Sequence, residues 1–574
     1  MSSQTQDLMV DEDIFLGLTI QMDLPQTPRL QGRPNSVPLF ETYLQTTFLA
    51  DSPSPLRPLA WSTLFHGYPG NLSAILQGIL TYGAEIGPSL PMLPNVCKNH
   101  LSSHDNEDLI SQKIVTDLAL GRIQATNSAV TSPLGLVPKA DGGFRRIHDL
   151  SSPAGFSVND SIDPAWAALH YTRIETILAH IITAGRGCYL VKRDIKDAFR
   201  MVPVSVQSRH LLGFIWKGIT YVECCLPFGL RTAPFLFNLF AESLHWILAQ
   251  QIDSAIEHYL DDFIFVVKCP TMLPLLREVY LSVTDQLGVP RNNAKNIEGT
   301  EAEVLGYTIN TIAMEIKLSP VKQQKAINQV TEALQKGWLS LQQAQQLAGR
   351  LAWCARVIRL GRSYSRSLWD FITKWPTKLS RYMSRRLPLE LKEDLNLWLE
   401  VLISSNGVLF FDDKERPQFH LFTDASSLKG YGGFYFSGEN GHWPDHVASL
   451  PQAQAFSCYP PLDQVDDHIN PKEIHAIAKA FKKWSSVWRH GSLCIHTDNM
   501  VAYSGIQNDV VKGSGNRSLR EILISSMTND ITMTATWVSS ANNGLADALS
   551  RFDRERLLLL CPKWQMNNSF LLNK

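Results

Sequence analysis

The sequence predicts an α+β fold followed by an α/β domain, and three observations lead to this prediction. Apolar runs flank Asp261-Asp262, which indicates two strands joined by a tight turn. From Ser319 to Arg366, apolar residues recur at the spacing of helices. After Pro417, strands and helices alternate along the chain, as they do in α/β domains.

The composition is that of a globular protein with room for several domains. The chain has 574 residues, 44% of them hydrophobic, and its 53 Lys and Arg nearly balance its 54 Asp and Glu. This balance does not point to nucleic acid, although a local basic groove would be enough to bind it. The nine cysteines include no Cys-x-x-Cys pair, so we expect reduced thiols and an intracellular protein. No apolar run reaches the roughly 18 residues of a membrane span, so no membrane partner is expected.

Two adjacent carboxylates, Asp261 and Asp262, follow Tyr259 and Leu260 at the tip of the expected hairpin. They repel each other and lose solvation there, which a divalent cation would offset. A solvated turn is the alternative, because Asp is common in turns. An apolar run that ends at Asp194 favours the cation, since a strand there could lie beside the hairpin. One sheet edge would then hold a site for two Mg²⁺ ions about 3.5–4 Å apart, which suits in-line phosphoryl transfer.

A second hairpin is expected over residues 132–150, where two apolar runs flank an Asp-Gly-Gly turn. Lys139 and Arg145 stand on either side of this turn. They are either exposed charges or a clamp for a triphosphate, which the arginine fork fits. Further along, Phe228 and Gly229 form a loop before a helix, and Gly229 would let the backbone approach a base pair. Pro and Gly are also common before ordinary helices.

Local signals mark the elements that follow. Val304-Leu305-Gly306-Tyr307 has the pattern of a short hairpin. Ser319 and Pro320 are expected to begin a helix that ends at Gly337. Ser340 is expected to open the next helix through a capping box with Gln343.

Four acids stand at strand ends or helix starts after Pro417. In order they are Asp424, Glu473, Asp498 and Asp547. For Glu473 there is a structural alternative, in which Asn470 caps a helix and Glu473 completes its capping box. A single acid of this kind is usually structural, but the four together have the pattern of a two-metal nuclease.

These motifs together resemble the polymerase–ribonuclease H unit of a retrotransposon, most closely the DIRS type, from Trp61 to Arg551. The pair at its centre is Tyr-x-Asp-Asp at 259–262 with Asp-x-x-Asp-Ala-Phe at 194–199. The other motifs are Gly-Arg-Ile at 121–123, Ile-His-Asp-Leu-Ser-Ser-Pro-Ala-Gly at 147–155, Arg-His-Leu-Leu-Gly-Phe at 209–214, Cys-Leu-Pro-Phe-Gly-Leu-Arg-Thr-Ala-Pro-Phe-Leu-Phe-Asn at 225–238, Thr-Asp-Ala-Ser at 423–426, Thr-Asp-Asn at 497–499 and Ala-Asp-Ala-Leu-Ser-Arg at 546–551.

The resemblance implies a right-hand polymerase with fingers, palm and thumb, which adds dNTPs to a DNA primer on an RNA template. Asp194, Asp261 and Asp262 would hold two Mg²⁺ ions, and Lys295 would protonate the leaving pyrophosphate. The other implied contacts are those of Lys139 and Arg145 with the triphosphate, Phe199 with the sugar, where it excludes a ribose 2′-OH, Phe228 and Gly229 with the nascent base pair, and Leu305 and Gly306 in the primer grip.

The resemblance also implies an α/β ribonuclease H-like domain that cuts the RNA strand of RNA–DNA hybrids. Asp424, Glu473, Asp498 and Asp547 would bind two further Mg²⁺ ions. The loop at 539–543 lacks the histidine that many cellular ribonucleases H carry there, so slower product release or metal exchange is expected. No protease, integrase or recombinase motif is seen, so mobility would need separate proteins.

The expected domains follow from the same resemblance. They are a disordered lead-in over 1–58, a helical N-terminal segment over 59–130, fingers and palm over 131–312, a helical thumb and connection over 313–414, a ribonuclease H domain over 415–553 and a tail over 554–574. Two alternatives remain, a catalytically silent, host-adopted nucleic-acid-binding protein and an RNA-copying RNA polymerase. Seven metal-binding acids count against the first, while Phe199 and the nuclease domain count against the second.

Overall fold

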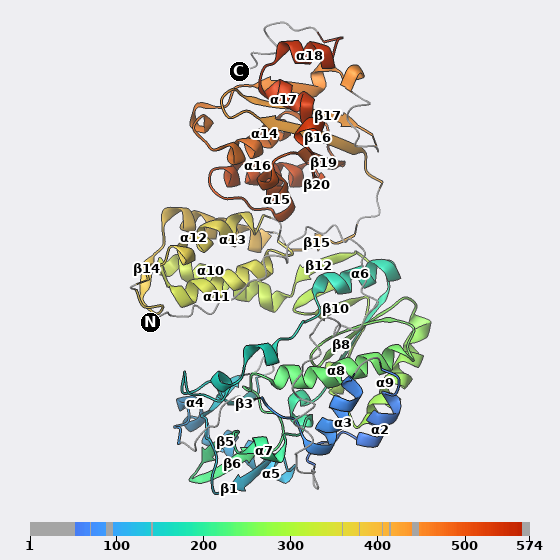
Figure 1. Cartoon of the computed structure of the whole chain (residues 1–574), viewed down its shortest axis with the longest axis vertical. Helices are drawn as coiled ribbons and strands as arrows, with labels where there is room; N and C mark the ends of the chain where they lie inside the picture. Colours follow the sequence, from blue (N-terminus) through green and yellow to red (C-terminus); the bar gives the residue numbers. More distant parts are fainter. Residues whose placement is uncertain are drawn as a thin grey trace. The chain divides into compact units, whose positions relative to one another are not determined.

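The structure is a computed structural model that describes residues 52–68, 71–87, 96–138, 142–358, 360–377, 379–404, 406–411, 415–438 and 447–564 (Figure 1). Most of the expected lead-in, residues 1–51, lies outside the described residues. The chain divides into two compact units. The N-terminal unit comprises the described residues up to Leu305 together with Ile309–Ala313. The C-terminal unit comprises Gly306–Thr308 and the described residues from Met314 onward.

A four-stranded antiparallel sheet organises the N-terminal unit. Its strand order is β7-β8-β4-β9, with bounds Ala255–Tyr259, Asp262–Val267, Tyr189–Asp194 and Ile297–Gly299. Aromatic and β-branched residues fill β8, as is typical of strands. The predicted hairpin around Asp261-Asp262 and the predicted strand ending at Asp194 are therefore both confirmed.

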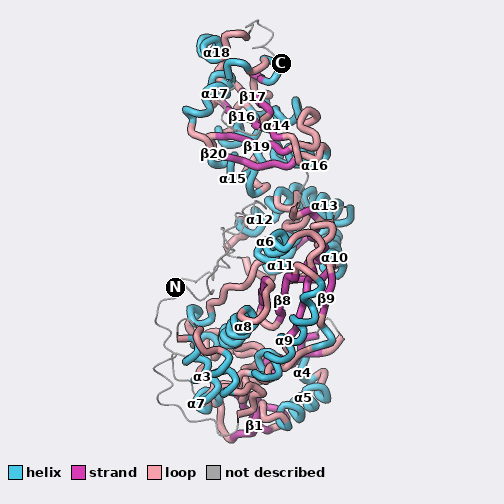
Figure 2. The backbone as a smooth tube through the Cα atoms, turned by 90° about the vertical axis from the view of Figure 1, so that its right-hand side faces the viewer, coloured by secondary structure: helices cyan, strands magenta, loops and turns pink. Residues whose placement is uncertain are grey.

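Helices pack against this sheet and bury a single large core. Helix α8 contacts β7 and helix α6 contacts β8, and Figure 2 shows α8 and α9 beside the sheet. The rings of Trp61 and Phe240 meet edge to face at 5.4 Å, so the first described helix joins the same core. The helices that contribute to this core are α2 (Pro58–Leu64), α3 (Leu72–Tyr82), α8 (Ala233–Ala249) and α9 (Leu273–Leu287), and the helix that contacts β8 is α6 (Ile174–Ala184).

Two smaller sheets lie wholly within the N-terminal unit. The predicted hairpin of β2 (Leu134–Pro138) and β3 (Phe144–His148) is confirmed, with Leu134 opposite His148. The other sheet has the order β1-β6-β5. The remaining elements are β1 (Ile123–Thr126), β5 (Gly213–Trp216), β6 (Ile219–Glu223), β10 (Glu301–Val304), α4 (Leu101–His104), α5 (Glu107–Ala119) and α7 (Val206–Arg209), with β11 (Tyr307–Asn310) at the boundary of the units.

The first part of the C-terminal unit is helical. As predicted, α10 (Pro320–Lys336) begins after Ser319 and ends at Gly337, whose φ is +71°. The capping box of Ser340 with Gln343 is also confirmed, and it opens α11 (Leu341–Cys354). The other elements here are β12 (Glu315–Leu318), β13 (Trp338–Ser340), α12 (Arg366–Thr373), β14 (Ser384–Arg386), α13 (Leu389–Ser404) and β15 (Val408–Leu409).

A five-stranded mixed sheet forms the rest of this unit, with the order β18-β17-β16-β19-β20. Strand β16 runs parallel to β19, β19 runs parallel to β20, and the other pairs are antiparallel. Helix α14 packs against β16 and α16, whereas α17 packs against β16 and β17. The bounds are β16 (Gln418–Ala425), β17 (Tyr431–Ser437), β18 (Ala455–Cys458), α14 (Ile469–Trp484), β19 (Ser492–Thr497), α15 (Met500–Asn508), α16 (Gly515–Thr528), β20 (Thr532–Trp537), α17 (Gly544–Ser550) and α18 (Arg554–Leu560).

The start of α14 differs from the capping alternative considered for Glu473. The helix begins at Ile469, and its N-cap is His468, whose Nδ1 accepts a hydrogen bond from the Asn470 N–H at 3.3 Å. Asn470 therefore lies inside the first turn and does not cap the helix. Glu473 forms no capping box, because its Oε1 accepts from the N–H of Ala425 on β16 at 3.3 Å.

Among the described residues, no helix combines the length and the hydropathy that crossing a membrane would require.

Candidate active sites

Three carboxylates meet at one edge of the sheet in the N-terminal unit. Asp194, the last residue of β4, is the register partner of Asp262, the first residue of β8. The N–H of Ile195 donates to the Asp261 carbonyl at 2.9 Å, which ties the hairpin turn to the end of β4. Leu260 adopts φ +53° in that two-residue turn, so the backbone turns sharply enough to place Asp261 beside Asp194.

Two lysines neutralise part of this negative charge. Lys295 Nζ lies 2.9 Å from Asp194 Oδ1, and Lys192 Nζ lies 3.0 Å from Asp262 Oδ2. The N–H of Asn292 donates to the Asp194 carbonyl at 2.9 Å and so holds the loop that carries Lys295 against β4. Within the described residues, the oxygens of the three carboxylates do not all come within 4.8 Å of one another. The backbone brings the acids together, and two of the three side chains form ion pairs with lysines.

The raised pKa values of the acids at this edge show that burial and mutual repulsion destabilise their charged forms. Burial, the Asp262 carboxylate and then the Asp194 carboxylate raise the pKa of Asp261 to about 6. Burial also raises the pKa of Asp262, against the opposing effect of Lys192. The hydrogen bond to Asp194 raises the pKa of Lys295, so its ammonium keeps its proton at neutral pH. A divalent cation would relieve the repulsion that raises the Asp261 pKa.

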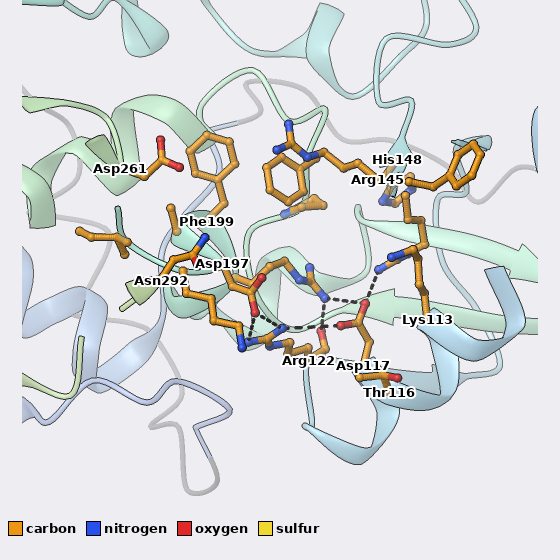
Figure 3. Close-up of a pocket in the computed structure, with 18 of the residues that line it drawn as sticks. Lys113, Thr116, Asp117, Arg122, Arg145, His148, Asp197, Phe199, Asp261 and Asn292 are labelled. Atoms are coloured by element: carbon orange, nitrogen blue, oxygen red, sulfur yellow. Dashed lines mark hydrogen bonds and ion pairs between the residues drawn. The ribbon is translucent and has the colours of Figure 1, made fainter. Parts of the chain in front are cut away.

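An open cavity of about 680 Å³ adjoins the carboxylates, and Figure 3 shows Asp261, Phe199 and Arg145 around it. Phe199 is half-buried, with its ring 5.2 Å from that of Phe228 and 5.8 Å from that of Phe237. The exposed Arg145 guanidinium lies 4.5 Å over the Phe228 ring, a cation–π contact. The structure thus brings Arg145, Phe199 and Phe228 together with Asp194, Asp261 and Lys295 around one cavity.

Gly229 has a structural requirement of its own. Its φ is +116°, and a Cβ at this position would lie 1.9 Å from the carbonyl oxygen of His148. The N–H of His148 also donates to the Phe228 carbonyl at 3.0 Å, so the loop is bound to β3. Only glycine fits this close approach, which explains the residue whether or not a base pair lies beside it.

Three further residues were predicted to contact the nucleotide or the primer: Lys139, Leu305 and Gly306. Lys139 lies outside the described residues. Leu305 and Gly306, with φ of +49° and +81°, form the predicted tight turn between β10 and β11. Their proposed contact with a primer stays a prediction.

Sequence reasoning missed an ion pair beside the cavity, in which two nitrogens of one arginine share one carboxylate oxygen. Asp197 Oδ2 accepts hydrogen bonds from both Nη atoms of Arg122 at 3.1 Å (Figure 3). Asp197 adopts φ +54°, in the turn between β4 and Phe199. The Asp-x-x-Asp pattern contained Asp197, but nothing in the sequence identified Arg122 as its partner.

A buried ion-pair network below the same cavity was also missed. The fully buried Glu223 accepts from Arg200 at 2.7 Å and pairs with Arg146 at 3.0 Å, and both arginines also pair with Asp117. Burial raises the pKa of Glu223, but Arg146 and Arg200 outweigh it and lower that pKa to about 2. The network fixes β3, which carries Arg145, to β6. Charged residues within the apolar strands 144–148 and 219–223 were the available signal.

Three acids converge in the C-terminal unit. Asp424 lies near the end of β16, Glu473 lies on α14 and Asp498 directly follows β19, and their ligand oxygens are all within 4.8 Å of one another. Parallel pairing of β16 with β19 places the ends of both strands at one sheet edge. Glu473 is buried, and its Oε2 has no hydrogen-bond partner among the described residues. A buried carboxylate oxygen without a donor fits a cation site.

Asp547 lies near this cluster but points to two arginines. Its Oδ1 accepts from Arg551 Nε and its Oδ2 accepts from Arg556 Nη1, both at 2.5 Å. The structure therefore does not bring Asp547 into the group of oxygens within 4.8 Å. The nearby Asp547 charge still contributes to raising the pKa of Asp424.

Two serines contact the clustered acids, and sequence reasoning missed both. Ser540 Oγ donates to Asp498 Oδ2 at 2.7 Å, and Ser550 Oγ donates to Asp424 Oδ2. Ser540 belongs to the loop at 539–543 that lacks a histidine, so a hydroxyl reaches the site from that loop. Ser550 lies within the Ala-Asp-Ala-Leu-Ser-Arg motif, which was the available signal.

Burial makes this second cluster costly to ionise. It raises the pKa of Asp424 to about 6, an effect that the Ser550 hydrogen bond opposes and the Asp498 charge increases. Burial and the charges of Asp424 and Asp498 raise the pKa of Glu473 well above its ordinary value. A cavity of about 400 Å³ opens onto the three acids. These groups are hard oxygen donors, and a divalent cation would stabilise their charged forms.

Comparison with known proteins gives a family for part of the chain. Residues 137–309 match the family described as "Reverse transcriptase (RNA-dependent DNA polymerase)". The match includes the end of β2, the whole of β3, the carboxylate edge and part of the cavity lining. This segment is a reverse transcriptase domain.

Curated relatives are Pol proteins of retroelements. The Intracisternal A-particle Pol-related polyprotein of mouse intracisternal A-particle MIA14 is 24% identical over 281 residues, which are 48% of this chain and 30% of that protein. The retrovirus-related Pol polyprotein from transposon opus of Drosophila melanogaster is 24% identical over 316 residues, 54% of this chain and 29% of that protein. The chain thus spans about a third of the length of these relatives.

Among solved structures, a foamy viral protease-reverse transcriptase in complex with double-stranded DNA is similar, with 15% identity and a TM-score of 0.47 over 85% of this chain and 83% of that one. By its own elements, the chain has the predicted fold class, an α+β right-hand polymerase fold followed by an α/β ribonuclease H-like domain.

Proposed function

We propose that this chain, whose residues 137–309 form a reverse transcriptase domain, is an RNA-directed DNA polymerase that extends a DNA primer along an RNA template. The observation that carries the proposal is the pairing of Asp194 with Asp262 beside Asp261, at the mouth of a basic and aromatic cavity. We assign fingers and palm to 131–312, thumb and connection to 313–414, and a ribonuclease H domain to 415–553.

The carboxylate edge fits the metal that this chemistry needs. Asp194, Asp261 and Asp262 offer hard oxygens on one sheet edge, and the raised pKa of Asp261 marks charge that lacks compensation. Two Mg²⁺ ions bound there would activate the primer 3′-OH and neutralise the triphosphate. The protein itself contributes positioning: strands β4 and β8 hold the acids at a fixed separation, so little reorganisation is needed during reaction.

Four side chains are proposed to hold the incoming dNTP. Arg145, stacked on Phe228, presents its guanidinium to the triphosphate together with Lys139. Phe199 lies under the sugar and leaves no room for a 2′-OH. Phe228 and Gly229 line the nascent base pair, and Leu305 and Gly306 belong to the primer grip.

Lys295 is proposed as the proton donor to the leaving pyrophosphate. Its ammonium lies at the carboxylate edge, and its raised pKa means that it carries the proton that a general acid must give. Opening of the ion pair with Asp194 would free Oδ1 for a cation in addition to Oδ2. Lys295 would then turn toward the nearby negative charge of the triphosphate.

A second function, ribonuclease H cleavage of the RNA strand in an RNA–DNA hybrid, rests on a separate observation. Asp424, Glu473 and Asp498 converge within 4.8 Å, and one oxygen of Glu473 is buried without a donor. These acids would bind two Mg²⁺ ions that activate the attacking water. Asp547 would join them after it leaves Arg551 or Arg556.

We further propose that the element is a retrotransposon of DIRS type, on the motifs at 147–155 and 225–238. The partners are then an RNA template, a DNA primer, the RNA–DNA hybrid and dNTPs. A silent nucleic-acid-binding protein would need none of the seven acids, and an RNA-copying enzyme would need neither Phe199 nor a nuclease domain.

Primer extension tests the proposed polymerase directly. The full chain is incubated with poly(rA)·oligo(dT), Mg²⁺ and dTTP, with rUTP in a parallel reaction. We expect dTMP addition that stops when EDTA removes the metal. Addition of rUMP at an equal rate would favour the RNA polymerase, and binding of the hybrid without any addition would favour the silent protein.

The hybrid-cleavage assay is run separately on a uniformly labelled RNA–DNA duplex. We expect Mg²⁺-dependent shortening of the RNA strand and none of the DNA strand. An intact RNA strand in a preparation that extends primers would remove the second function and leave the first.

A further inference from the structure

A second type of ligand cluster lies on the same sheet as the three acids of the C-terminal unit. His420 on β16, together with Cys494 and His496 on β19, has ligand atoms that are all within 4.8 Å of one another. His420 and Cys494 are register partners on parallel strands, which Figure 1 shows side by side, and His496 is two residues further along β19. Side chains two residues apart in a strand share a face, so all three belong to one face of the sheet.

The two imidazoles face each other in fixed orientations. His420 Nδ1 lies 2.9 Å from His496 Nε2. The His496 ring stacks on Phe422 at 4.1 Å with an interplanar angle of 6°, and the His420 ring stacks on Phe436 at 5.2 Å and 25°. Both histidines are buried, and aromatic packing together with their mutual hydrogen bond holds the rings in place. Such preorganisation lowers the entropic cost of binding an ion between them.

The hydrogen bonds around the rings indicate which ring nitrogens carry protons. His420 Nε2 lies 3.2 Å from the carbonyl oxygen of Gly438, which can only accept, so Nε2 carries the proton and Nδ1 the lone pair. A ligand histidine commonly makes such a bond through its other nitrogen. In the metal-free chain His496 Nε2 therefore donates to His420 Nδ1, and a bound ion would take the place of this proton. His496 Nδ1 has no hydrogen-bond partner among the described residues, so it can carry the proton when Nε2 binds an ion.

Cys494 supplies a sulfur on the open side of the cluster. It is partly exposed and in no disulfide, and its Sγ lies 3.3 Å from Thr536 Oγ1 on β20. Two imidazoles and one thiol are nitrogen and sulfur donors, which Mg²⁺ does not favour and zinc does. The donor set therefore differs in kind from the carboxylates of the two candidate active sites.

We propose that His420 Nδ1, Cys494 Sγ and His496 Nε2 bind one Zn²⁺ ion, with water as the fourth ligand of a tetrahedral site. Cys494 binds as the thiolate and releases its proton to solvent, so binding is coupled to proton loss. The three protein ligands come from two strands far apart in the sequence, so the ion cross-links β16 to β19. This proposal does not depend on polymerase or nuclease activity.

The position of this site implies a structural consequence. Asp424 is four residues after His420 on β16, and Asp498 is two residues after His496. The ion would therefore bind two to four residues before the acids, and it would hold in place the strand ends that carry them. We expect Zn²⁺ to raise the melting temperature of the C-terminal unit, since an ion bound only by the folded state stabilises it.

Cobalt substitution tests the site with a readout that is independent of activity. The full chain is freed of metal, kept reduced with a phosphine, and titrated with Co²⁺ in excess Mg²⁺ so that the carboxylate sites are occupied. We expect a thiolate-to-cobalt absorption band that saturates at one equivalent, a tetrahedral visible band, and displacement of both by Zn²⁺.

Two variants test the proposed ligands, and a third serves as the control. Cys494→Ser and His496→Gln remove one donor each and should weaken Co²⁺ binding at least about tenfold, the lower end of the loss that even a changed partner of a ligand typically causes. Cys269→Ser is the matched control, because Cys269 is an exposed free thiol in the N-terminal unit. It should bind Co²⁺ as the unmodified chain does.

Circular dichroism shows whether each variant is folded, and Cys494→Ser is the decisive one because Cys494 is only partly buried. A folded Cys494→Ser chain that keeps the sulfur band and the affinity would overturn the proposal. So would an unmodified chain that shows no saturable band, or a band that Cys269→Ser abolishes. A melting temperature raised by Zn²⁺ in the control but not in Cys494→Ser supports the cross-link.

Discussion

Lys295 Nζ and Asp194 Oδ1 lie 2.9 Å apart, so the proposed general acid and one proposed metal ligand form an ion pair. The same ammonium lowers the pKa of Asp261, although burial and the two neighbouring acids outweigh it. Charge balance at this edge is therefore shared among three carboxylates and two lysines. Changes at any of these residues should alter metal binding before they alter folding.

Asp261→Asn should abolish polymerisation while leaving the nuclease intact. The change keeps the size of the side chain but removes a negative charge that faces the metal, so we expect DNA synthesis to fall by at least about two orders of magnitude. Cleavage of an RNA–DNA hybrid should persist, because its acids lie in the other unit. Primer extension and hybrid cleavage on the same preparation measure both.

The matched control is Asp253→Asn, an exposed aspartate in the loop between α8 and β7. It should extend primers at the rate of the unmodified chain. Normal extension by Asp261→Asn would show that the carboxylate edge is not the polymerase site.

Glu473→Gln should remove ribonuclease H activity without destabilising the protein. Glu473 is buried, and burial raises its pKa well above the ordinary value, so the neutral glutamine suits this environment at least as well as the carboxylate. Glutamine can still accept from the N–H of Ala425. We expect an unchanged or higher melting temperature, together with lost cleavage and retained primer extension.

Hybrid cleavage and a thermal melt check this prediction. If Glu473→Gln still cuts the RNA strand, Glu473 serves only to join α14 to β16. The exposed Glu521→Gln on α16 is the control and should leave both measurements unchanged.

Much of this architecture could be predicted from local patterns in the sequence. The apolar runs around Asp194 and Asp261-Asp262 predicted all three strands, because alternation and turn residues act locally. Ser340 gave its capping box for the same reason. The prediction that Asn470 caps the helix was wrong, because the cap is His468, a rarer capping residue, and the Asn-Pro pair lies within the first turn.

Contacts between distant residues could not be predicted. Arg122 and Asp197 form an ion pair, yet each is an ordinary surface charge in the sequence. His420 and His496 meet only because β16 and β19 pair in parallel with a particular register. The spacing of residues in the sequence identifies ligands that share one turn or one hairpin. It does not identify ligands that are brought together by the register of a sheet.

Asp424→Asn should stabilise the C-terminal unit when no divalent cation is present. Burial raises the pKa of Asp424 to about 6 in the folded chain, so between its unfolded value of 3.8 and 6 the folded state binds more protons. Stability is therefore highest below the unfolded pKa and falls as pH rises through this window. Each pKa unit corresponds to about 1.4 kcal/mol, so the loss is at most about 3 kcal/mol.

Melting in EDTA at a series of pH values from 4 to 8 checks this sign. The gain from Asp424→Asn should be small near pH 4, grow up to about pH 6 and stay constant above it. Added Mg²⁺ should reduce the gain at pH 8, since it stabilises the charged cluster of the unmodified chain only. A gain that is the same at every pH would mean that the change acts through packing instead of charge.

The choice between dNTP and rNTP should depend on Phe199, which lies five residues after Asp194 at the edge of the cavity. Its ring is half-buried against Phe228 and Phe237, so it is held in place where a 2′-OH would need space. A smaller side chain removes this steric exclusion. We expect Phe199→Val to add ribonucleotides far better than the unmodified chain while it remains a polymerase.

The alternative is that Phe199 only fills the core beside α8. In that case the change costs about 1–4 kcal/mol of stability, as large-to-small core substitutions do, and leaves the sugar preference unaltered. Phe237→Leu is the control, because Phe237 is fully buried on α8 and contacts Phe199 without lining the cavity. It should lower the melting temperature and keep the dNTP preference. Single-nucleotide addition with dNTP and rNTP, alongside a thermal melt, separates the two roles. If folded, active Phe199→Val has an unchanged ratio of dNTP to rNTP addition, Phe199 does not belong to the sugar site. An RNA polymerase would then be the better interpretation of the same palm.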